Sequence, residues 1–99
     1  MRELVRVYKA LSDESRLRIL AALADTRYGV CDLARHLGLS QPTLSHHLKI
    51  LRDTGLVSAE RDGPSTYCTL NAEAFERYGI CIDKLLTRCR QTAWKTTTE

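Results

Sequence analysis

The side chains best suited to chemistry lie close together, near the middle of the 99-residue sequence. They are hydrogen-bonding or cationic groups: Ser40, Gln41, Thr43, Ser45, His46 and Lys49. A glutamine amide can pair bidentately with adenine, hydroxyl and imidazole groups can donate to bases or phosphates, and an ammonium binds phosphate. This set therefore predicts a surface that reads and holds duplex DNA. The competing interpretation is the solvated face of an ordinary helix.

The same segment contains leucines that would place these polar groups on one face of a helix. Leu44 is the first of three leucines that share one side at 100° per residue, and Ser45, His46 and Lys49 fall on the far side. Gln41 would lie in the first turn, where recognition helices commonly meet base edges. The neighbouring His47 falls near the apolar side, so we expect it to pack rather than to read a base.

Four cysteines, at positions 31, 68, 81 and 89, form a second group of reactive side chains. Charged residues interrupt the N-terminal segment, which therefore lacks the apolar run of a secretory signal. The helical pattern can also build a core without covalent links, so we expect reduced thiols and a cytoplasmic protein. Thiolates bind soft ions such as arsenic(III), antimony(III) or cadmium, and a pair of thiols can also be oxidised.

Spacing limits which cysteines can share one ion. Cys81 and Cys89 are eight residues apart, or ~12 Å along one helix, whereas two thiolates on one ion lie within about 4 Å of each other. A shared site therefore needs a second element: Cys81 with Cys89 of the partner subunit, or either of them with Cys31 or Cys68. We favour Cys31 and Cys89. The alternative is that Cys81 and Cys89 pack in an apolar stripe and Cys68 packs in a strand.

The apolar pattern that must position these groups begins with four helices. The first covers 4–11, and the second is capped by Ser12 and buries a stripe of Leu17, Leu20, Ala21 and Ala24. The third covers 30–37 and is closed by Gly38 in the left-handed conformation. Ser40 caps the fourth helix, which tolerates Pro42 in its first turn and runs to about residue 53 or 54, before Gly55.

A hairpin and a last helix complete the expected order. The short runs 56–61 and 66–70 flank an Asp-Gly-Pro-Ser turn at 62–65, which predicts two paired strands. Asn71 would cap one last helix over about 72–90, with an apolar stripe of Ala74, Phe75, Tyr78, Cys81, Ile82, Leu85, Leu86 and Cys89. A small domain cannot cover so long a stripe alone, so we expect part of it to form a dimer surface with the first helix.

Length and composition narrow the class of protein. With 99 residues, 43% of them hydrophobic, the chain predicts one domain over 1–99, with 91–99 as a frayed tail. The net charge of +3 permits nucleic-acid binding, and no apolar run approaches the ~20 residues that span a membrane. The three histidines lie in the candidate DNA-binding half, and no glycine-rich phosphate loop or nucleophile elbow is present, so we expect neither enzymatic activity nor an obligatory cofactor.

Four helices, a hairpin and a last helix give the order of a winged helix-turn-helix. With Ala10–Leu20, Leu39–Leu51 and Gly55–Val57, the chain resembles the ArsR/SmtB family of bacterial transcriptional repressors. The resemblance implies a mainly α fold with a small β-hairpin, a homodimer joined through the first and last helices, and a palindromic operator. The hairpin would be the wing, with Arg61, Ser65, Thr66 and Tyr67 near DNA. Arg61 would enter a minor groove or hold a phosphate, and the alternative is a plain solvated tip.

The resemblance also implies release of DNA by an inducer, usually a metal or metalloid ion. Arsenic and cadmium sensors of the family often carry Cys-Val-Cys-Asp-Leu where this chain has Gly29-Val30-Cys31-Asp32-Leu33. The last-helix zinc site of other members needs histidines, and none follows His47. We therefore predict a repressor released by a thiol-directed inducer: arsenite, antimonite or a soft metal ion. The alternatives are a thiol-redox or reactive-sulfur sensor, a regulator with no metal inducer, and a winged helix that binds protein.

Overall fold

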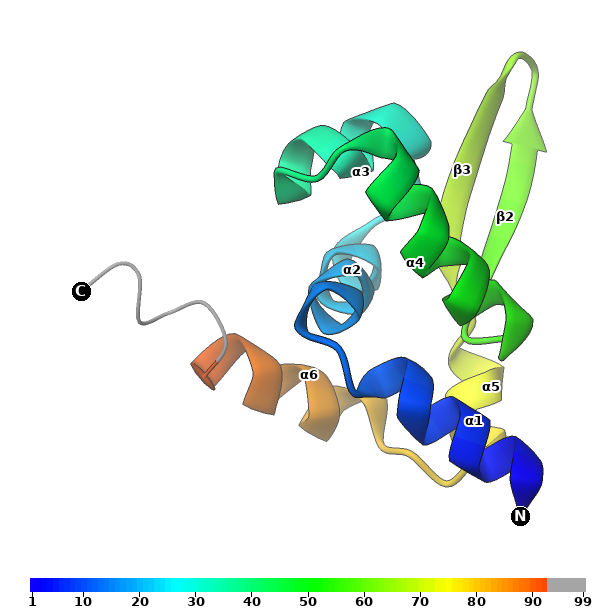
Figure 1. The fold of residues 1–99 in the computed structure, drawn as a ribbon, viewed down its shortest axis with the longest axis vertical. Helices are drawn as coiled ribbons and strands as arrows, with labels where there is room; N and C mark the ends of the chain where they lie inside the picture. The colour runs from blue at the N-terminus through cyan, green and yellow to red at the C-terminus, as the bar shows by residue number, and fades with distance from the viewer. Residues whose placement is uncertain (93–99) are drawn as a thin grey trace.

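The computed structural model describes residues 1–92, and side chains as far as residue 88. The order is α1 (Arg2–Leu11), α2 (Glu14–Asp25), β1 (Tyr28–Gly29), α3 (Val30–Leu37), α4 (Gln41–Asp53), β2 (Val57–Asp62), β3 (Ser65–Leu70), α5 (Ala72–Arg77) and α6 (Ile82–Thr92) (Figure 1). The fold is a mainly helical winged helix-turn-helix, as predicted. No helix within the described residues is long and apolar enough to cross a membrane.

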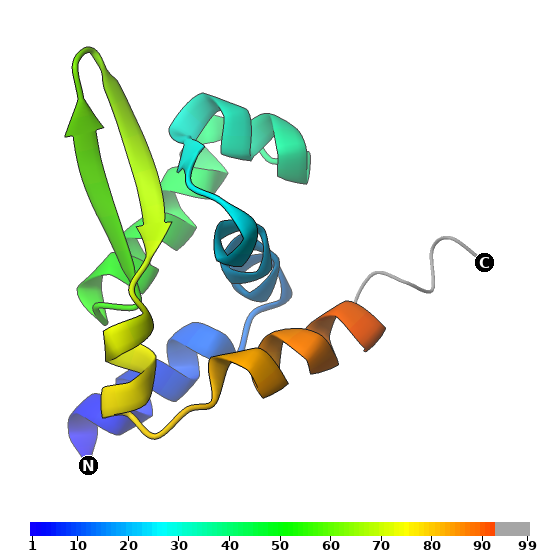
Figure 2. The same ribbon diagram turned by 180° about the vertical axis from the view of Figure 1, so that it is seen from behind.

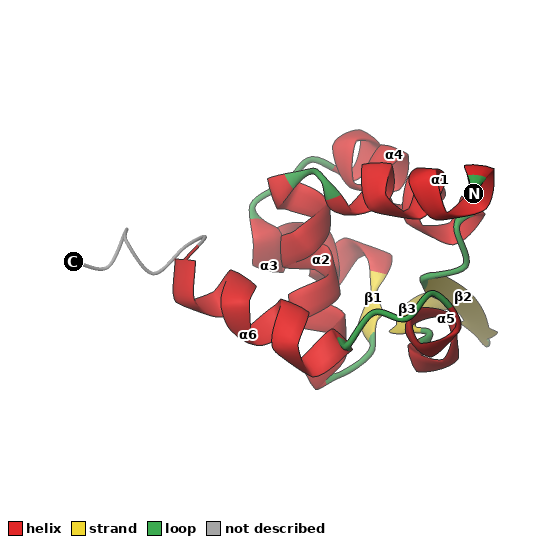
Figure 3. Ribbon diagram, turned by 90° about the horizontal axis from the view of Figure 1, so that it is seen from below, coloured by secondary structure: helices red, strands yellow, loops and turns green. Residues whose placement is uncertain are grey.

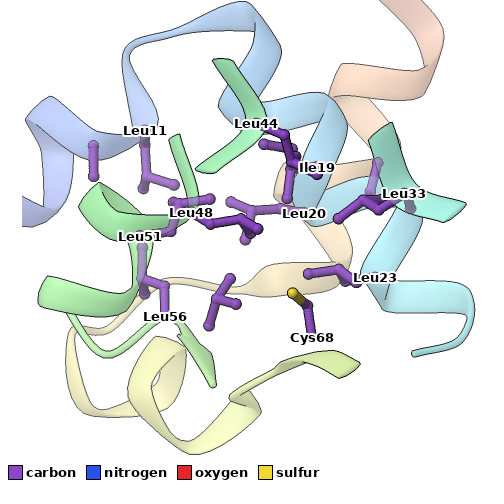
Figure 4. Packing of buried hydrophobic residues seen from close by; sticks show 14 of the residues in the cluster. Leu11, Ile19, Leu20, Leu23, Leu33, Leu44, Leu48, Leu51, Leu56 and Cys68 are labelled. Atoms are coloured by element: carbon purple, nitrogen blue, oxygen red, sulfur yellow. The ribbon is translucent and has the colours of Figure 1, made fainter. Parts of the chain in front are cut away.

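Helix α2 occupies the centre of the core. It packs against α1, α3, α4, α6 and β3, and its residues Ile19 to Leu23 are all buried (Figure 4). The predicted single stripe on this helix is wrong in part, because Ala24 is exposed and Leu17 only half-buried. A helix that is surrounded on several sides buries more than one face, and a one-sided periodicity cannot anticipate that.

The junction of α1 and α2 differs by one residue from the prediction. Asp13, not Ser12, is the N-cap of α2, and its carboxylate accepts a hydrogen bond from the backbone N–H of Arg16 at 3.1 Å. Ser12 instead donates its hydroxyl to the carbonyl of Lys9, at 2.7 Å, and so ends α1. Both residue types can cap a helix, so the choice depends on where α1 stops.

The helix-turn-helix agrees with the sequence at each boundary. Gly38 ends α3 with φ +71°, and the N–H groups of Gly38 and Leu39 return to carbonyls of the last turn. Ser40 then caps α4, and its Oγ accepts from the backbone N–H of Thr43 at 3.3 Å. The short turn leaves α3 packed against α4 and fixes the direction in which α4 presents its outer face.

The wing belongs to a three-stranded antiparallel sheet of order β1-β3-β2. The predicted hairpin is confirmed, with Val57 opposite Leu70 at its base and Asp62 opposite Ser65 at its tip. The short strand β1 was not predicted: Tyr28 pairs with Cys68 of β3. Figure 2 shows the hairpin projecting beyond the helices.

The prediction of one last helix is wrong. The chain forms α5 and α6 instead, separated at Gly79, which has φ +71°. The N–H groups of Gly79 and Ile80 return to the carbonyls of Glu76 and Phe75, at 3.0 and 2.9 Å, and close α5 after six residues. Helix α6 runs to Thr92, two residues into the expected tail; residues 93–99 of that expectation lie outside the described residues.

Candidate nucleic-acid interface

The outer face of α4 is exposed and polar. Each of the predicted DNA-reading side chains of this segment is exposed: Ser40, Gln41, Thr43, Ser45, His46 and Lys49. On the opposite face, Leu44 and Leu51 have no exposed area and Leu48 only 5%. The structure therefore confirms that the two faces divide as the sequence indicated.

Local contacts hold the first and last turns of this face. The Ser40 hydroxyl donates to Thr43 Oγ1 at 2.9 Å, in addition to capping the helix, and Pro42 occupies the first turn. At the other end, Lys49 Nζ lies 3.4 Å from the Asp53 carboxylate, one turn further along. The Lys49 side chain remains 76% exposed, so a phosphate can replace this weak surface partner.

His47 lies at the edge of the face and contacts α2 rather than solvent alone. Its Nδ1 accepts from the Arg16 guanidinium at 3.4 Å, and Arg16 Nε donates to the carbonyl of Ala10 at 2.7 Å. Burial lowers the pKa of His47, the charges of Arg16 and His46 lower it further, and Asp13 opposes them. Arg16 thus connects α1, α2 and α4 through its contacts with Ala10 and His47.

Asp13 completes this cluster. Burial by itself disfavours its charged form, but the hydrogen bond from the Arg16 backbone and the charges of Arg16 and His47 lower the pKa of the carboxyl overall. The carboxylate therefore remains ionised and capping at neutral pH. Asp13 and Arg16 hold the junction of α1, α2 and α4, and sequence analysis did not single them out.

The wing presents a mixed set of side chains. Arg61 and Ser65 are exposed, whereas Thr66 and Tyr67 are half-buried. The Tyr67 ring is covered by the guanidinium of Arg27, 4.0 Å from the ring centroid. Tyr67 therefore packs as part of the wing rather than extending freely from it.

Arg27 is a residue that the sequence analysis missed. Besides the contact with Tyr67, its guanidinium lies 3.4 Å from the Asp62 carboxylate at the end of β2. Arg27 precedes β1, so it ties the wing to the end of α2. No sequence spacing signals this contact, because Arg27 and Asp62 are 35 positions apart.

Cys31 lies beside the recognition helix. Its exposed thiol accepts from the Gln41 side-chain amide, with Nε2 2.9 Å from Sγ. A cavity of about 370 Å³ opens here between the start of α3 and the wing, lined by Gly29, Val30, Cys31, Asp32, Pro64, Ser65, Thr66 and Tyr67. The structure thus brings one predicted sensor residue next to one predicted base reader.

The other cysteines differ from Cys31 in their surroundings. Cys68 is buried in β3, with 1% exposure, and burial raises the pKa of its thiol, although the Arg52 charge opposes the shift. Cys81 is exposed and precedes α6, so the expectation that it lies buried in a continuous helical stripe is wrong. Cys89 lies on α6, but its side chain is outside the described part of the structure.

The described side chains alone do not assemble a metal site. Among them, no group of three or more histidine, cysteine, aspartate or glutamate residues could hold one ion. The burial of Cys68 fits packing better than ligation, because a ligand thiol must reach its ion as a thiolate. Cys31 and Cys81 are the described thiols that remain accessible.

Comparison with known proteins places the chain among bacterial regulators. Residues 13–59 match the family described as bacterial regulatory protein, arsR family. An arsenical resistance operon repressor of Staphylococcus aureus is 47% identical over 70 residues, which cover 71% of this chain and 67% of that protein. A repressor of the same description from Staphylococcus xylosus is 39% identical over 94 residues, which cover 95% and 90%.

Solved structures agree with the fold. The homodimeric winged helix-turn-helix DNA-binding domain of a Mycobacterium bovis protein superposes with a TM-score of 0.71 at 32% identity, and the match covers 79% of this chain and 73% of that one. The family match coincides with α2 to β2, which contain the whole helix-turn-helix. The chain belongs to the ArsR family of bacterial regulatory proteins.

Proposed function

We propose that this protein is a transcriptional repressor that binds a palindromic operator as a homodimer and releases it when an inducer reacts with its thiols. The observation that carries the DNA-binding half of this proposal is the division of α4, with buried leucines behind and exposed polar groups in front. Such a surface is suited to binding DNA rather than to catalysis. Operator DNA as the partner implies a cytoplasmic location.

DNA recognition divides between base reading and phosphate binding. Gln41 and Thr43, in the first turn of α4, have the groups to read base edges, whereas Lys49 has a charge suited to phosphate. Ser40, Ser45 and His46 add donors along the same face. The wing residues Arg61, Ser65 and Thr66 would contact the neighbouring groove or backbone, with Tyr67 as their packed support.

A titration of operator DNA tests this division, with DNA from upstream of the protein's own gene. Lys49→Ala should weaken binding to all sequences and flatten the dependence of affinity on salt. Gln41→Ala should instead lose discrimination at one base position, worth about 1–3 kcal/mol. Operator binding that is unaffected by either substitution would contradict the assignment of this face.

Thiol sensing is supported by the contact between Cys31 and Gln41. A trivalent metalloid or soft metal ion bound to Sγ would occupy the position of the amide nitrogen, 2.9 Å away, and so displace Gln41 from its reading position. Cys81 and Cys89 are candidate second ligands, from this chain or from the partner subunit. The arsenical resistance repressors among the relatives favour arsenite as the first inducer to test.

Release of operator DNA by arsenite, antimonite and cadmium measures this sensing. Cys31→Ser should keep operator binding, because a hydroxyl still accepts from Gln41, but should lose most of the response to the inducer. Cys81→Ser and Cys89→Ser identify the second ligand. A wild-type response in a variant that lacks all three of these thiols would exclude thiol sensing. Release by an oxidant and recovery with a reductant would favour the redox alternative, which the exposed thiols of Cys31 and Cys81 also permit.

Gly29 offers a gain-of-function control. It has φ −66° and ψ 153°, which any residue adopts, and an added Cβ would meet its nearest atoms at 3.8–3.9 Å, an ordinary contact. Gly29→Cys would therefore place a second thiol two residues before Cys31 without strain. We expect this variant to respond to lower arsenite concentrations than the wild type. An unchanged response would argue against a sensor at the start of α3.

A further inference from the structure

Helix α1 has three distinct faces. Val7, Ala10 and Leu11 are buried against the core, whereas Leu4, Val5 and Tyr8 form an exposed apolar flank. At 100° per residue, the remaining side carries the exposed cations Arg2, Arg6 and Lys9, which we call the basic flank. The apolar flank suits contact with a protein partner, whereas the charged side chains of the basic flank suit a different kind of ligand.

The basic flank adjoins the C-terminal half of α4. A cavity of about 300 Å³ is lined by Arg6, Lys9, Ala10, Arg16, Ile50, Asp53 and Thr54. A second cavity, of about 260 Å³, shares Arg6 and adds the cations of Arg52 and Arg77. The acidic residues lining these cavities are Asp53, which pairs with Lys49, and Glu3. We call the residues that line these two cavities the seam between α1 and α4. Cations therefore outnumber carboxylates along this seam.

The seam continues the outer face of α4 rather than lying behind it. Asp53 is one turn beyond Lys49 on the same side of the helix, so the Lys49 ammonium marks the point where the recognition face meets the cavity. Figure 3 shows α1 and α4 along one side of the molecule and α6 along the other. Arg6 and Lys9 line a cavity together with Asp53, and so lie beside the end of this outer face.

The charges of the basic flank are available for a ligand. Within the described residues, the side chains of Arg6 and Lys9 form no ion pair, in contrast to Lys49. Arg16 is already engaged with His47 and with the carbonyls of Lys9 and Ala10. Exposed, unpaired cations beside a DNA-reading helix match the regular negative charge of a sugar-phosphate backbone.

We propose that the basic flank of α1 binds the phosphate backbone of duplex DNA, through Arg6 and Lys9, beyond the groove that α4 reads. The inference rests on the proposed function, because it extends the same DNA interface. It assigns α1 two roles, with its apolar flank free for dimerisation and its basic flank on the DNA strand. Phosphate contacts carry no base preference, so this surface would add affinity and fix orientation rather than select the operator.

The salt dependence of DNA affinity tests this proposal. Arg6→Gln and Lys9→Gln should each lower affinity for operator and for unrelated duplex DNA by the same factor. The slope of log affinity against log salt should fall by about 0.9 for each phosphate that the protein no longer neutralises, and so by roughly two for each substitution in a dimer. The double variant should lose roughly twice as much slope as either single one.

Lys84→Gln is the matched control. It removes the same charge from an exposed position of α6, a helix that lies on the other side of the molecule from α4, and should leave the slope unchanged. Circular dichroism and sedimentation verify that each variant remains folded and has the wild-type assembly state. Wild-type operator binding with unchanged slopes in Arg6→Gln and Lys9→Gln would overturn this inference alone. Failure of the wild-type protein to bind any DNA would overturn the proposed function as well.

Discussion

At the residue scale, the contact between Gln41 and Cys31 brings together a candidate base-reading group and a candidate inducer-binding thiol, which the sequence analysis treated as two separate groups. The amide that would read a base donates to the thiol that would bind an inducer, at 2.9 Å. The two residues belong to successive helices, α4 and α3, and the short turn between them brings them together. A chemical change at the Cys31 sulfur would therefore act directly on the Gln41 amide, without any rearrangement of the fold.

His47 provides a prediction at the same scale. Its pKa is lowered in the folded protein, so the unfolded chain takes up a proton first as the pH falls. The free energy of unfolding should therefore decrease as the pH falls from 7 through the ordinary histidine value of 6.5, and this contribution should level off below the folded pKa. The contribution of His47 to the free energy of unfolding is fully present only well above pH 6.5. Urea denaturation at pH 7.5, 6.5 and 5.5 measures it.

His47→Gln should remove this part of the pH dependence, because a glutamine can accept from Arg16 without titrating. Asp13 acts at lower pH, since its carboxyl has a pKa lowered from 3.8. His36→Gln, at an exposed position of α3, should show the same decrease in unfolding free energy as the wild type. An equal decrease in unfolding free energy between pH 7.5 and 5.5 in the wild type and in His47→Gln would show that the Arg16–His47 contact does not govern stability in this range.

At the element scale, α4 has two faces of different character: one is apolar and buried, and the other is polar and exposed. Its leucines pack on α2 and the sheet, whereas Gln41, Ser45 and His46 on the outer face are exposed and bury no core area. The wing has a similar division, because Arg27 holds Tyr67 and Asp62 while Arg61 remains exposed.

Two adjacent substitutions measure this division. Leu44→Ala removes a fully buried side chain and should cost about 2–5 kcal/mol of unfolding free energy. Ser45→Ala, one residue later and exposed, should change stability by no more than about 0.5 kcal/mol but weaken DNA binding. Chemical denaturation gives both values. Comparable losses of stability for the two variants would contradict the assignment of buried and exposed faces.

At the scale of the whole molecule, the exposed apolar flank of α1 indicates assembly. Leu4, Val5 and Tyr8 are 37%, 45% and 54% exposed, and the Mycobacterium bovis domain with the same fold is homodimeric. Two protomers would place two copies of α4 about 34 Å apart, in successive major grooves. A dimer would therefore bind two half-sites of an operator at once, which one copy of α4 cannot do.

Tyr8→Glu tests the contribution of this flank. A charge on the apolar surface should shift the protein from dimer toward monomer in sedimentation equilibrium and weaken operator binding at least tenfold, about 1.4 kcal/mol. Ala72→Glu adds the same charge at an exposed position at the start of α5 and should change neither property. A Tyr8→Glu variant that remains dimeric would show that α1 does not contribute to the interface.

The sequence by itself determined the parts of this protein that depend on local order. Helix α4, its cap at Ser40, the break at Gly38 and the wing hairpin follow from capping, periodicity and turn residues, which act over a few neighbours. Periodicity also predicted which side of α4 would be buried, because one apolar stripe on a surface helix can face only one core.

Only the tertiary structure decided the features that join distant segments. The break at Gly79 competed with an apolar stripe that continues on both sides of it, and only the folded chain shows that the left-handed turn prevails. Strand β1, the Arg27–Asp62 pair and the Cys31–Gln41 contact depend on packing between residues that no local pattern relates. The same holds for the seam between α1 and α4, since the position of a charge relative to another helix is a property of packing, not of sequence spacing.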